Sequence, residues 1–345
     1  MRINGTDCHD YLTKTVKPKL SYSKKCNYPD WTQKVREIFI ELTGLDLISK
    51  NACDDNFTVV GEKQKDGYKQ IRFEFESEKG SVVPVYILIP DGEVKKRPVA
   101  ITLQGHSTGF HNSVAEPKYP SDEDYMPRGA FAVQAVKEGY VAVAIEQRGM
   151  GERKAENTKE RALQLYEGGT CFYEQMTASM FGRTLIGERC WDIKRTIDML
   201  AHFDKYCDFD KIFITGNSGG GTASYYAACY DDRIKLCAPS CSFCSYGESI
   251  LKMLHCACNY IPHIYKYVDM QDIACLIAPR KLLIIAGKED SIFLIKGVRE
   301  GFETVKKIYA AAGVPEKCKL VETEKGHWWC ADIVWREIRV QLNNL

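Results

Sequence analysis

A run of apolar, β-branched residues at 211–215 leads directly into a glycine-rich turn that carries the motif Gly-x-Ser-x-Gly. Small residues continue through 222–228, so the order predicts a buried strand, a sharp turn and a closely packed helix. Glycines on both sides of Ser218 relieve crowding around a residue with strained backbone angles. Such strain would expose the Ser218 hydroxyl at the amino end of the helix, where negative charge is stabilised. We therefore predict that Ser218 is a nucleophile, with an idle serine in a strand-to-helix turn as the structural alternative.

A serine nucleophile needs a base, and the base needs a third group that orients it. After a turn of this kind, the acid and then the histidine are expected to follow the serine along the chain. A buried strand predicted at 281–287 leads to Glu289 and Asp290, and a short strand at 318–322 is followed by His327. Both loops fall at the carboxyl ends of strands, which is the edge where open α/β sheets build their sites.

We predict that His327 is the base and that Asp290 is the acid. The shorter side chain of Asp290 suits a fixed hydrogen bond from a loop to the imidazole ring, and Glu289 stays as the alternative acid. Aspartate is also a favoured helix cap, so capping of residues 291–293 is a structural role open to Asp290.

Several motifs together resemble those of α/β-hydrolases and, within them, those of the bacterial acetyl-xylan-esterase-like and dienelactone-hydrolase-like serine hydrolases. They lie at residues 103–109, 146–153, 216–220, 287–290 and 326–327. The resemblance implies the α/β-hydrolase fold, with a mostly parallel central sheet, an antiparallel N-terminal edge and helices on both faces. It also implies a serine hydrolase that cleaves a carboxylic ester through a Ser-Asp-His triad and an acyl-enzyme, with deacetylation of a carbohydrate as one form of that reaction.

Two other functions stay open for such a fold. One is a peptidase of the prolyl-oligopeptidase kind, and the other is a catalytically idle binding protein. The peptidases usually carry a propeller or another large amino-terminal domain, which residues 1–65 are too few to form. We expect a small-molecule or carbohydrate ester as the substrate and no cofactor.

The resemblance implies an oxyanion hole made of two backbone N–H groups. One belongs to Gly219, directly after the nucleophile, and the other to His106, in the loop after a strand predicted at 98–103. The alternative for His106 is simple loop structure, with its imidazole as a polar wall of the pocket.

Two further residues are candidates for binding the substrate. Arg148 follows a strand predicted at 140–145, so it is expected at the same edge of the sheet, where a guanidinium suits a carboxylate or a sugar oxygen. Its alternative role is structural, with the guanidinium tying loop carbonyls together. Trp328, which directly follows His327, is the second candidate.

The charge balance and the apolar runs exclude some partners. Lys and Arg total 47 and Asp and Glu total 46, so no overall field attracts nucleic acid or an anionic membrane. No apolar run approaches the roughly 20 residues of a membrane span, and the amino terminus lacks the apolar core of a signal peptide. The 15 cysteines then favour free thiols in a reducing compartment, and we expect a cytoplasmic protein. Assembly into a homo-oligomer is left open.

A cysteine-rich stretch at 237–258 raises the question of a metal site. Its candidate ligands are Cys237, Cys241, Cys244, Cys256, Cys258 and His255. One pair has the Cys-x-x-Cys spacing of zinc sites, whereas the other is Cys-x-Cys, a poor match. Cys237 belongs to a predicted strand, and free cysteine packs well as a small apolar residue. We therefore favour packing over structural zinc and predict no metal.

The chain divides into an N-terminal arm and helix at 1–65 and a catalytic domain at 66–345. Apolar residues at helical spacing predict the first helix near 30–43. Two antiparallel strands, at 68–76 and 82–89, are expected to open the catalytic domain. Insertions are expected near 152–180 and 240–275, the second of which would lie over the catalytic edge as a site wall, an interface or buried packing.

Overall fold

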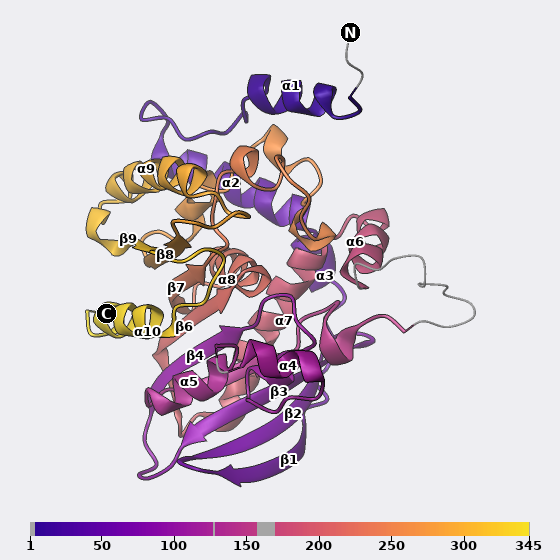
Figure 1. Cartoon of the computed structure of the whole chain (residues 1–345), viewed down its shortest axis with the longest axis vertical. Helices are drawn as coiled ribbons and strands as arrows, with labels where there is room; N and C mark the ends of the chain where they lie inside the picture. The colour runs from indigo at the N-terminus through magenta and orange to yellow at the C-terminus, as the bar shows by residue number, and fades with distance from the viewer. Residues whose placement is uncertain (1–3, 127, 157–169, 345) are drawn as a thin grey trace.

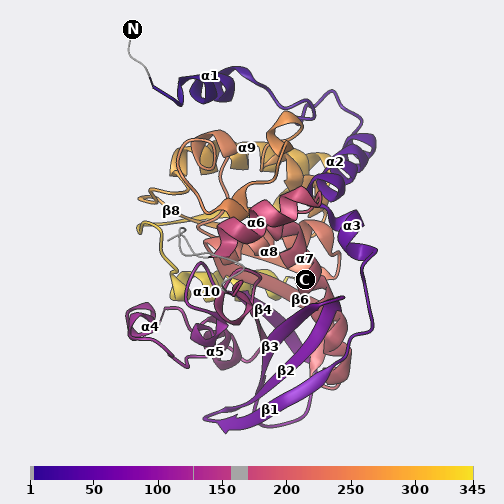
Figure 2. The same cartoon turned by 90° about the vertical axis from the view of Figure 1, so that its right-hand side faces the viewer.

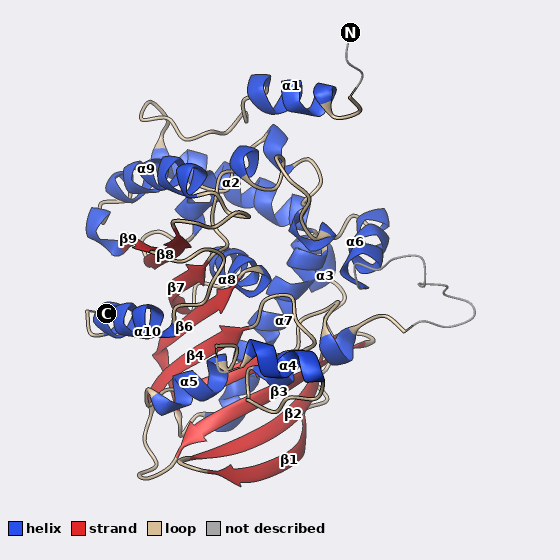
Figure 3. Cartoon of the chain, in the orientation of Figure 1, coloured by secondary structure: helices blue, strands red, loops and turns tan. Residues whose placement is uncertain are grey.

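A computed structural model describes residues 4–126, 128–156 and 170–344. In this part of the chain, nine strands form one sheet in the order β1-β2-β3-β5-β4-β6-β7-β8-β9 (Figure 1). Helices pack on both faces of this sheet (Figure 3). The predicted fold class is confirmed, because the sheet is mostly parallel and has an antiparallel N-terminal edge.

The antiparallel edge consists of β1 (Thr58–Lys65), β2 (Tyr68–Glu78) and β3 (Ser81–Pro90). Burial largely alternates along β2, because one face of this part of the sheet packs inward while the other meets solvent. β1 precedes the expected start of the catalytic domain at residue 66, yet it belongs to the same sheet as the rest.

The parallel part carries the catalytic edge. Its strands are β4 (Arg97–Leu103), β5 (Val141–Ile145), β6 (Cys207–Asn217), β7 (Ile234–Ser240), β8 (Lys281–Gly287) and β9 (Cys318–Thr323). Most are continuous apolar runs, since helices cover both faces. Because these strands are parallel, their carboxyl ends meet at one edge, and the loops that follow them lie together there.

Two apolar cores lie on opposite faces of the sheet. In β6, Ile212 and Ile214 belong to one core and Phe213 to the other, as the period of two requires. The larger core takes side chains from α2 (Tyr28–Thr43), α3 (Leu45–Ser49), α7 (Leu185–Met199), α8 (Gly219–Tyr230) and α9 (Ile295–Ala311). The smaller core takes side chains from α5 (Phe131–Lys137) and α10 (Ala331–Leu342).

The remaining elements refine the sequence-based predictions. The predicted arm contains α1 (Asp7–Thr15), which has no buried residue and extends away from the sheet (Figure 2). A 3₁₀ turn, Leu200–Phe203, directly follows α7. Between β4 and β5, a short α4 (Pro120–Tyr125) precedes α5.

The two expected insertions differ in what the structure describes. Of the first, near 152–180, residues 157–169 lie outside the described residues, and α6 (Thr170–Met180) follows them. The second, near 240–275, is a long connection between β7 and β8 with four 3₁₀ turns and neither an α-helix nor a strand among its residues. None of the helices in the described parts has both the length and the apolarity needed to cross a membrane.

Candidate active site

Ser218 stands at the turn between β6 and α8 with φ 55° and ψ −125°. This left-handed backbone costs energy for a residue with a side chain, and neighbouring glycines make room for it. A Cβ on Gly105 would lie 2.9 Å from the carbonyl oxygen of Asn217, and a Cβ on Gly220 would lie 2.2 Å from that of Leu103. The β4 loop and α8 therefore approach the serine closely only because these positions are glycine.

His327 and Asp290 form a hydrogen-bonded pair on the loops after β9 and β8. Nδ1 of His327 lies 2.9 Å from Oδ2 of Asp290. Glu289 is exposed, whereas Asp290 is buried. Oδ1 of Asp290 accepts the N–H groups of Ile292 at 2.8 Å and of Phe293 at 3.0 Å. One carboxylate thus makes both kinds of contact that the sequence left open, capping the following turn with one oxygen and holding the imidazole with the other.

The contacts of Asp290 favour its ionised form. Burial opposes ionisation, but the hydrogen bond and charge of His327 and the two loop amides outweigh it, so the pKa of Asp290 lies below its usual value. With Nδ1 committed to Asp290, Nε2 is the nitrogen of His327 that is left for Ser218.

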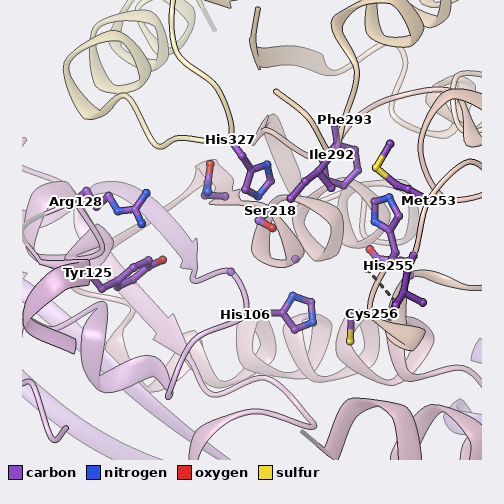
Figure 4. Close-up of a pocket in the computed structure, with 15 residues that line it drawn as sticks. His106, Tyr125, Arg128, Ser218, Met253, His255, Cys256, Ile292, Phe293 and His327 are labelled. Carbon is purple, nitrogen blue, oxygen red and sulfur yellow. Dashed lines mark hydrogen bonds between the residues drawn. The ribbon is translucent and has the colours of Figure 1, made fainter. Parts of the chain in front are cut away.

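Ser218 and His327 line one cavity of about 440 Å³ (Figure 4). Gly105, His106 and Gly219 border it beside the serine, while Ile292 and Phe293 border it beside the imidazole. The insertion after β7 contributes a further side of the wall, with Met253, Leu254, His255, Cys256 and Asn259. Residues 253–256 and Asn259 of the insertion thus form a wall of the site, as one of the three interpretations of this segment expected.

The two residues predicted for the oxyanion hole lie next to each other. Gly219 begins α8, whose first N–H groups have no partner within the helix. A Cβ on Gly219 would lie 2.8 Å from Nδ1 and Cε1 of His106, so the imidazole packs directly against this glycine. The backbone of Gly105 hydrogen-bonds the Tyr125 hydroxyl. The amide of Gly219, directly after the serine, and the amide of His106, in the facing loop, therefore stay the two candidate donors.

A buried polar network shapes the loop that carries His106. Glu146, at the end of β5, accepts hydrogen bonds from Nε2 of Gln104 at 3.1 Å and from the amide of Phe110 at 3.2 Å. Burial raises the pKa of Glu146 to about 7, although the amides of Glu152 and Phe110 act in the opposite direction. The path of the loop from Gln104 to Phe110 thus depends on a single inward carboxyl group.

Arg128 is a cavity residue that the sequence analysis did not identify. Its guanidinium lies over the Trp328 ring, 3.9 Å from the centroid, and over the Tyr125 ring at 5.3 Å. Its Nε is buried and has no hydrogen-bond partner among the described residues. Trp328 is 45 % exposed and supports Arg128 rather than lining the cavity itself. No periodic pattern surrounds residue 128, so the sequence holds no signal for its position.

Arg148 lies apart from this cavity. Its Nη2 is 2.8 Å from Glu78, its Nη1 is 3.2 Å from Glu188 and its Nε is 2.9 Å from Asp192. Asp192 also pairs with Arg153. These ion pairs are largely buried, and they correspond to the structural alternative for Arg148, with carboxylates in place of loop carbonyls as its partners.

The cysteines of 237–258 do not gather at one point. The Sγ atoms of Cys237, Cys241 and Cys244 each meet a different backbone carbonyl, and burial raises the pKa of each thiol. Cys256 and Cys258 instead lie together, with their Sγ atoms 3.4 Å apart. Hydrogen bonds from the Cys171 and Cys256 thiols hold the pKa of Cys258 well below its usual value.

The chain matches known proteins in sequence and in structure. The model of the Abhydrolase family matches residues 5–234. A Bacillus subtilis (strain 168) protein named "Putative hydrolase YtaP" is 25 % identical over 259 residues, which cover 74 % of this chain and 81 % of that protein.

Among solved structures, a "putative acetyl xylan esterase" from Bacteroides fragilis NCTC 9343 superposes with a TM-score of 0.80 at 18 % identity, covering 99 % of this chain and 95 % of that one. A glucuronoyl esterase from Solibacter usitatus superposes with a TM-score of 0.67 at 14 % identity, covering 96 % and 98 %. At these identities the superpositions establish the shared fold.

Proposed function

Because the chain belongs to the Abhydrolase family, we propose that it is a serine hydrolase that cleaves a carboxylic ester with Ser218, His327 and Asp290. The observation that carries this proposal is the strained Ser218 turn in one cavity with an imidazole that Asp290 holds by Nδ1. An idle serine would have no need of the left-handed backbone, whose cost the fold meets with close glycine contacts.

In the first half of the reaction, Oγ of Ser218 attacks the ester carbonyl carbon while Nε2 of His327 takes the hydroxyl proton. The carbonyl oxygen becomes an oxyanion and accepts hydrogen bonds from the amides of Gly219 and His106. When the C–O bond to the alcohol breaks, the imidazolium gives its proton to the leaving alcohol oxygen, and the acyl group stays on Ser218.

In the second half, water attacks the acyl carbon as His327 takes one of its protons. The bond from the carbon to Oγ of Ser218 then breaks, His327 returns the proton to Oγ, and the carboxylic acid leaves. Asp290 stabilises the imidazolium in both halves and stays ionised, in line with its lowered pKa.

For the substrate, we propose an acyl ester of a carbohydrate. Two considerations support this class. The similar solved structures include acetyl xylan and glucuronoyl esterases. The cavity wall also mixes polar groups suited to sugar hydroxyls, on Arg128, His255 and Asn259, with the apolar side chains of Ile292 and Phe293.

The test combines a covalent probe with a substrate panel. A fluorophosphonate should label the parent protein once per chain and should fail to label Ser218→Ala. Ser224→Ala is the matched control, because this serine lies on α8 one to two turns beyond Ser218 and its hydroxyl donates to the Gly220 carbonyl of the same helix. The control should label like the parent. The panel compares p-nitrophenyl acetate, acetylated xylo-oligosaccharides, a methyl glucuronate ester and aminoacyl amides, and faster cleavage of amides than of every ester would reject the ester class.

A further inference from the structure

A second cluster of reactive side chains lies behind the oxyanion loop. It consists of His106, Cys171, Cys256 and Cys258, whose ligand atoms all lie within 4.8 Å of one another. Nε2 of His106 is 3.2 Å from Sγ of Cys258, which in turn is 3.4 Å from Sγ of Cys256. Figure 4 shows the His106 ring directed toward Cys256. Three separate segments supply these groups: the loop after β4, the start of α6 and the connection between β7 and β8.

We propose that these four residues bind one zinc ion as a Cys₃His site. Three thiolates and an imidazole are a typical ligand set for structural zinc, with Zn–S bonds of about 2.3 Å and tetrahedral geometry, which places ligand atoms about 3.8 Å apart. The observed separations of 3.2 and 3.4 Å, and the limit of 4.8 Å for all pairs, bracket that spacing.

Arg189 provides an independent indication of negative charge at this point. Its side chain is about 1 % exposed, and no carboxylate oxygen of the described residues lies within 4.0 Å of its guanidinium. The guanidinium donates to the carbonyl of Arg148 at 3.0 and 2.7 Å, to Sγ of Cys171 at 3.3 Å, and also to Cys258.

A buried cation without a counter-charge is strongly destabilising. Zn²⁺ with three thiolates and a neutral imidazole carries a net charge of −1, which the guanidinium of Arg189 neutralises. Without zinc, the groups whose charge acts on Arg189 are the thiols of the cluster and the Glu174 carboxylate, which lies beyond 4.0 Å. The zinc site therefore places one net negative charge where the Arg189 guanidinium donates to Cys171 and Cys258, and Arg189 in turn supports the ligands from outside, as second partners of metal ligands do.

Four protein ligands close the coordination sphere, so the ion has a structural and not a catalytic role. The ion would lie next to the proposed oxyanion hole, because the His106 ring packs against Gly219. Zinc would hold this ring, and with it the loop that presents the His106 amide, against the first turn of α8.

The test is to measure the zinc content per chain by inductively coupled plasma mass spectrometry, on untagged protein that was purified without chelators. We expect about one zinc per chain in the parent. Cys171→Ser and Cys258→Ser should each lower zinc content or affinity at least tenfold. Cys237→Ala is the matched control, since this thiol is also buried and belongs to the cysteine-rich stretch but lies outside the cluster, and it should retain the metal. A parent protein that stays free of zinc after growth and dialysis with zinc would overturn the proposal.

Cobalt substitution tests the site in the parent protein, so its result does not depend on whether the cysteine variants fold. Co²⁺ in the parent protein should give intense visible d–d bands of a tetrahedral site together with thiolate-to-cobalt charge transfer, and a spectrum without these features would refute the Cys₃His assignment. A Cys256–Cys258 disulfide in freshly purified parent protein, seen as a loss of two hydrogens by mass spectrometry, would refute it as well.

Ser218→Ala should keep its full zinc content, because Ser218 is not a ligand. The zinc measurement therefore tests the metal site independently of the proposed esterase function. Arg189→Met should weaken zinc binding by about 10- to 100-fold, the range for partners of metal ligands. Unchanged zinc affinity in a folded Arg189→Met protein would contradict the charge argument.

Discussion

Replacing Asp290 with asparagine separates the two roles of this side chain. In the Asp290→Asn variant, the side-chain carbonyl oxygen can take the place of Oδ1 and still accept the amides of Ile292 and Phe293. The NH₂ group then stands where Oδ2 met Nδ1 of His327 at 2.9 Å. Since that group donates, Nδ1 must accept, and the proton of the neutral imidazole moves to Nε2, where it blocks transfer from Ser218.

We therefore expect Asp290→Asn to lower kcat/KM for p-nitrophenyl acetate by roughly 10³- to 10⁴-fold, the size seen when a triad histidine is held in the wrong tautomer. The loss of stability should be small, about 1 kcal/mol, because two hydrogen bonds to the loop remain and only their charge assistance is lost. Asp290→Ala should lose a similar amount of activity and an additional 1–2 kcal/mol or so from the missing cap.

The assay pairs steady-state kinetics with urea denaturation of the same preparations. Glu289→Gln is the control, because Glu289 is exposed and adjacent in the chain, and we expect its activity to stay within about twofold of the parent. If Asp290→Asn kept more than a tenth of the parent activity while Glu289→Gln lost it, the assignment of the acid would be wrong.

The charges of the structure lead to three other predictions. The kcat/KM for a neutral ester should fall as the pH is lowered, because only a neutral imidazole of His327 can accept the proton of Ser218, whereas Asp290 with its lowered pKa stays ionised; a flat profile would contradict the role of His327. Arg148→Met should lower the free energy of unfolding by up to about 3 kcal/mol, since it removes the cation that three largely buried carboxylates share, while Arg153 and Arg183 still pair with them; a raised KM at unchanged stability would instead favour substrate binding. Burial raises the pKa of Glu146 to about 7 in the folded protein, whereas this carboxyl group has a pKa of about 4.3 in the unfolded chain. Between these two pH values the folded state binds more protons, so the free energy of unfolding falls as the pH rises. Glu146→Gln should remove that part of the slope in urea denaturation measured at intervals across this pH range, and an unchanged slope would show that Glu146 is ionised throughout.

Local sequence pattern was enough to predict the elements whose environment is regular. Continuous apolar runs marked the parallel strands, because strands covered on both faces contain few polar residues. The glycine-rich turn after β6 predicted the strained backbone of Ser218, since only small neighbours allow its angles. The chain order of Asp290 and His327 after parallel strands was enough to place them at one edge, because parallel strands share the direction of their carboxyl ends.

How loops of unrelated sequence meet, in contrast, depended on tertiary packing. Arg148 follows β5 at the same edge, but its side chain turns to carboxylates of β2 and α7 that no local pattern links to it. Cys171 joins Cys256, Cys258 and His106 from a distant part of the chain, whereas the sequence spacing pointed to neighbours such as Cys241 and Cys244. Residues close in sequence can point in different directions, and which side chains converge depends on packing between segments that a one-dimensional pattern does not contain.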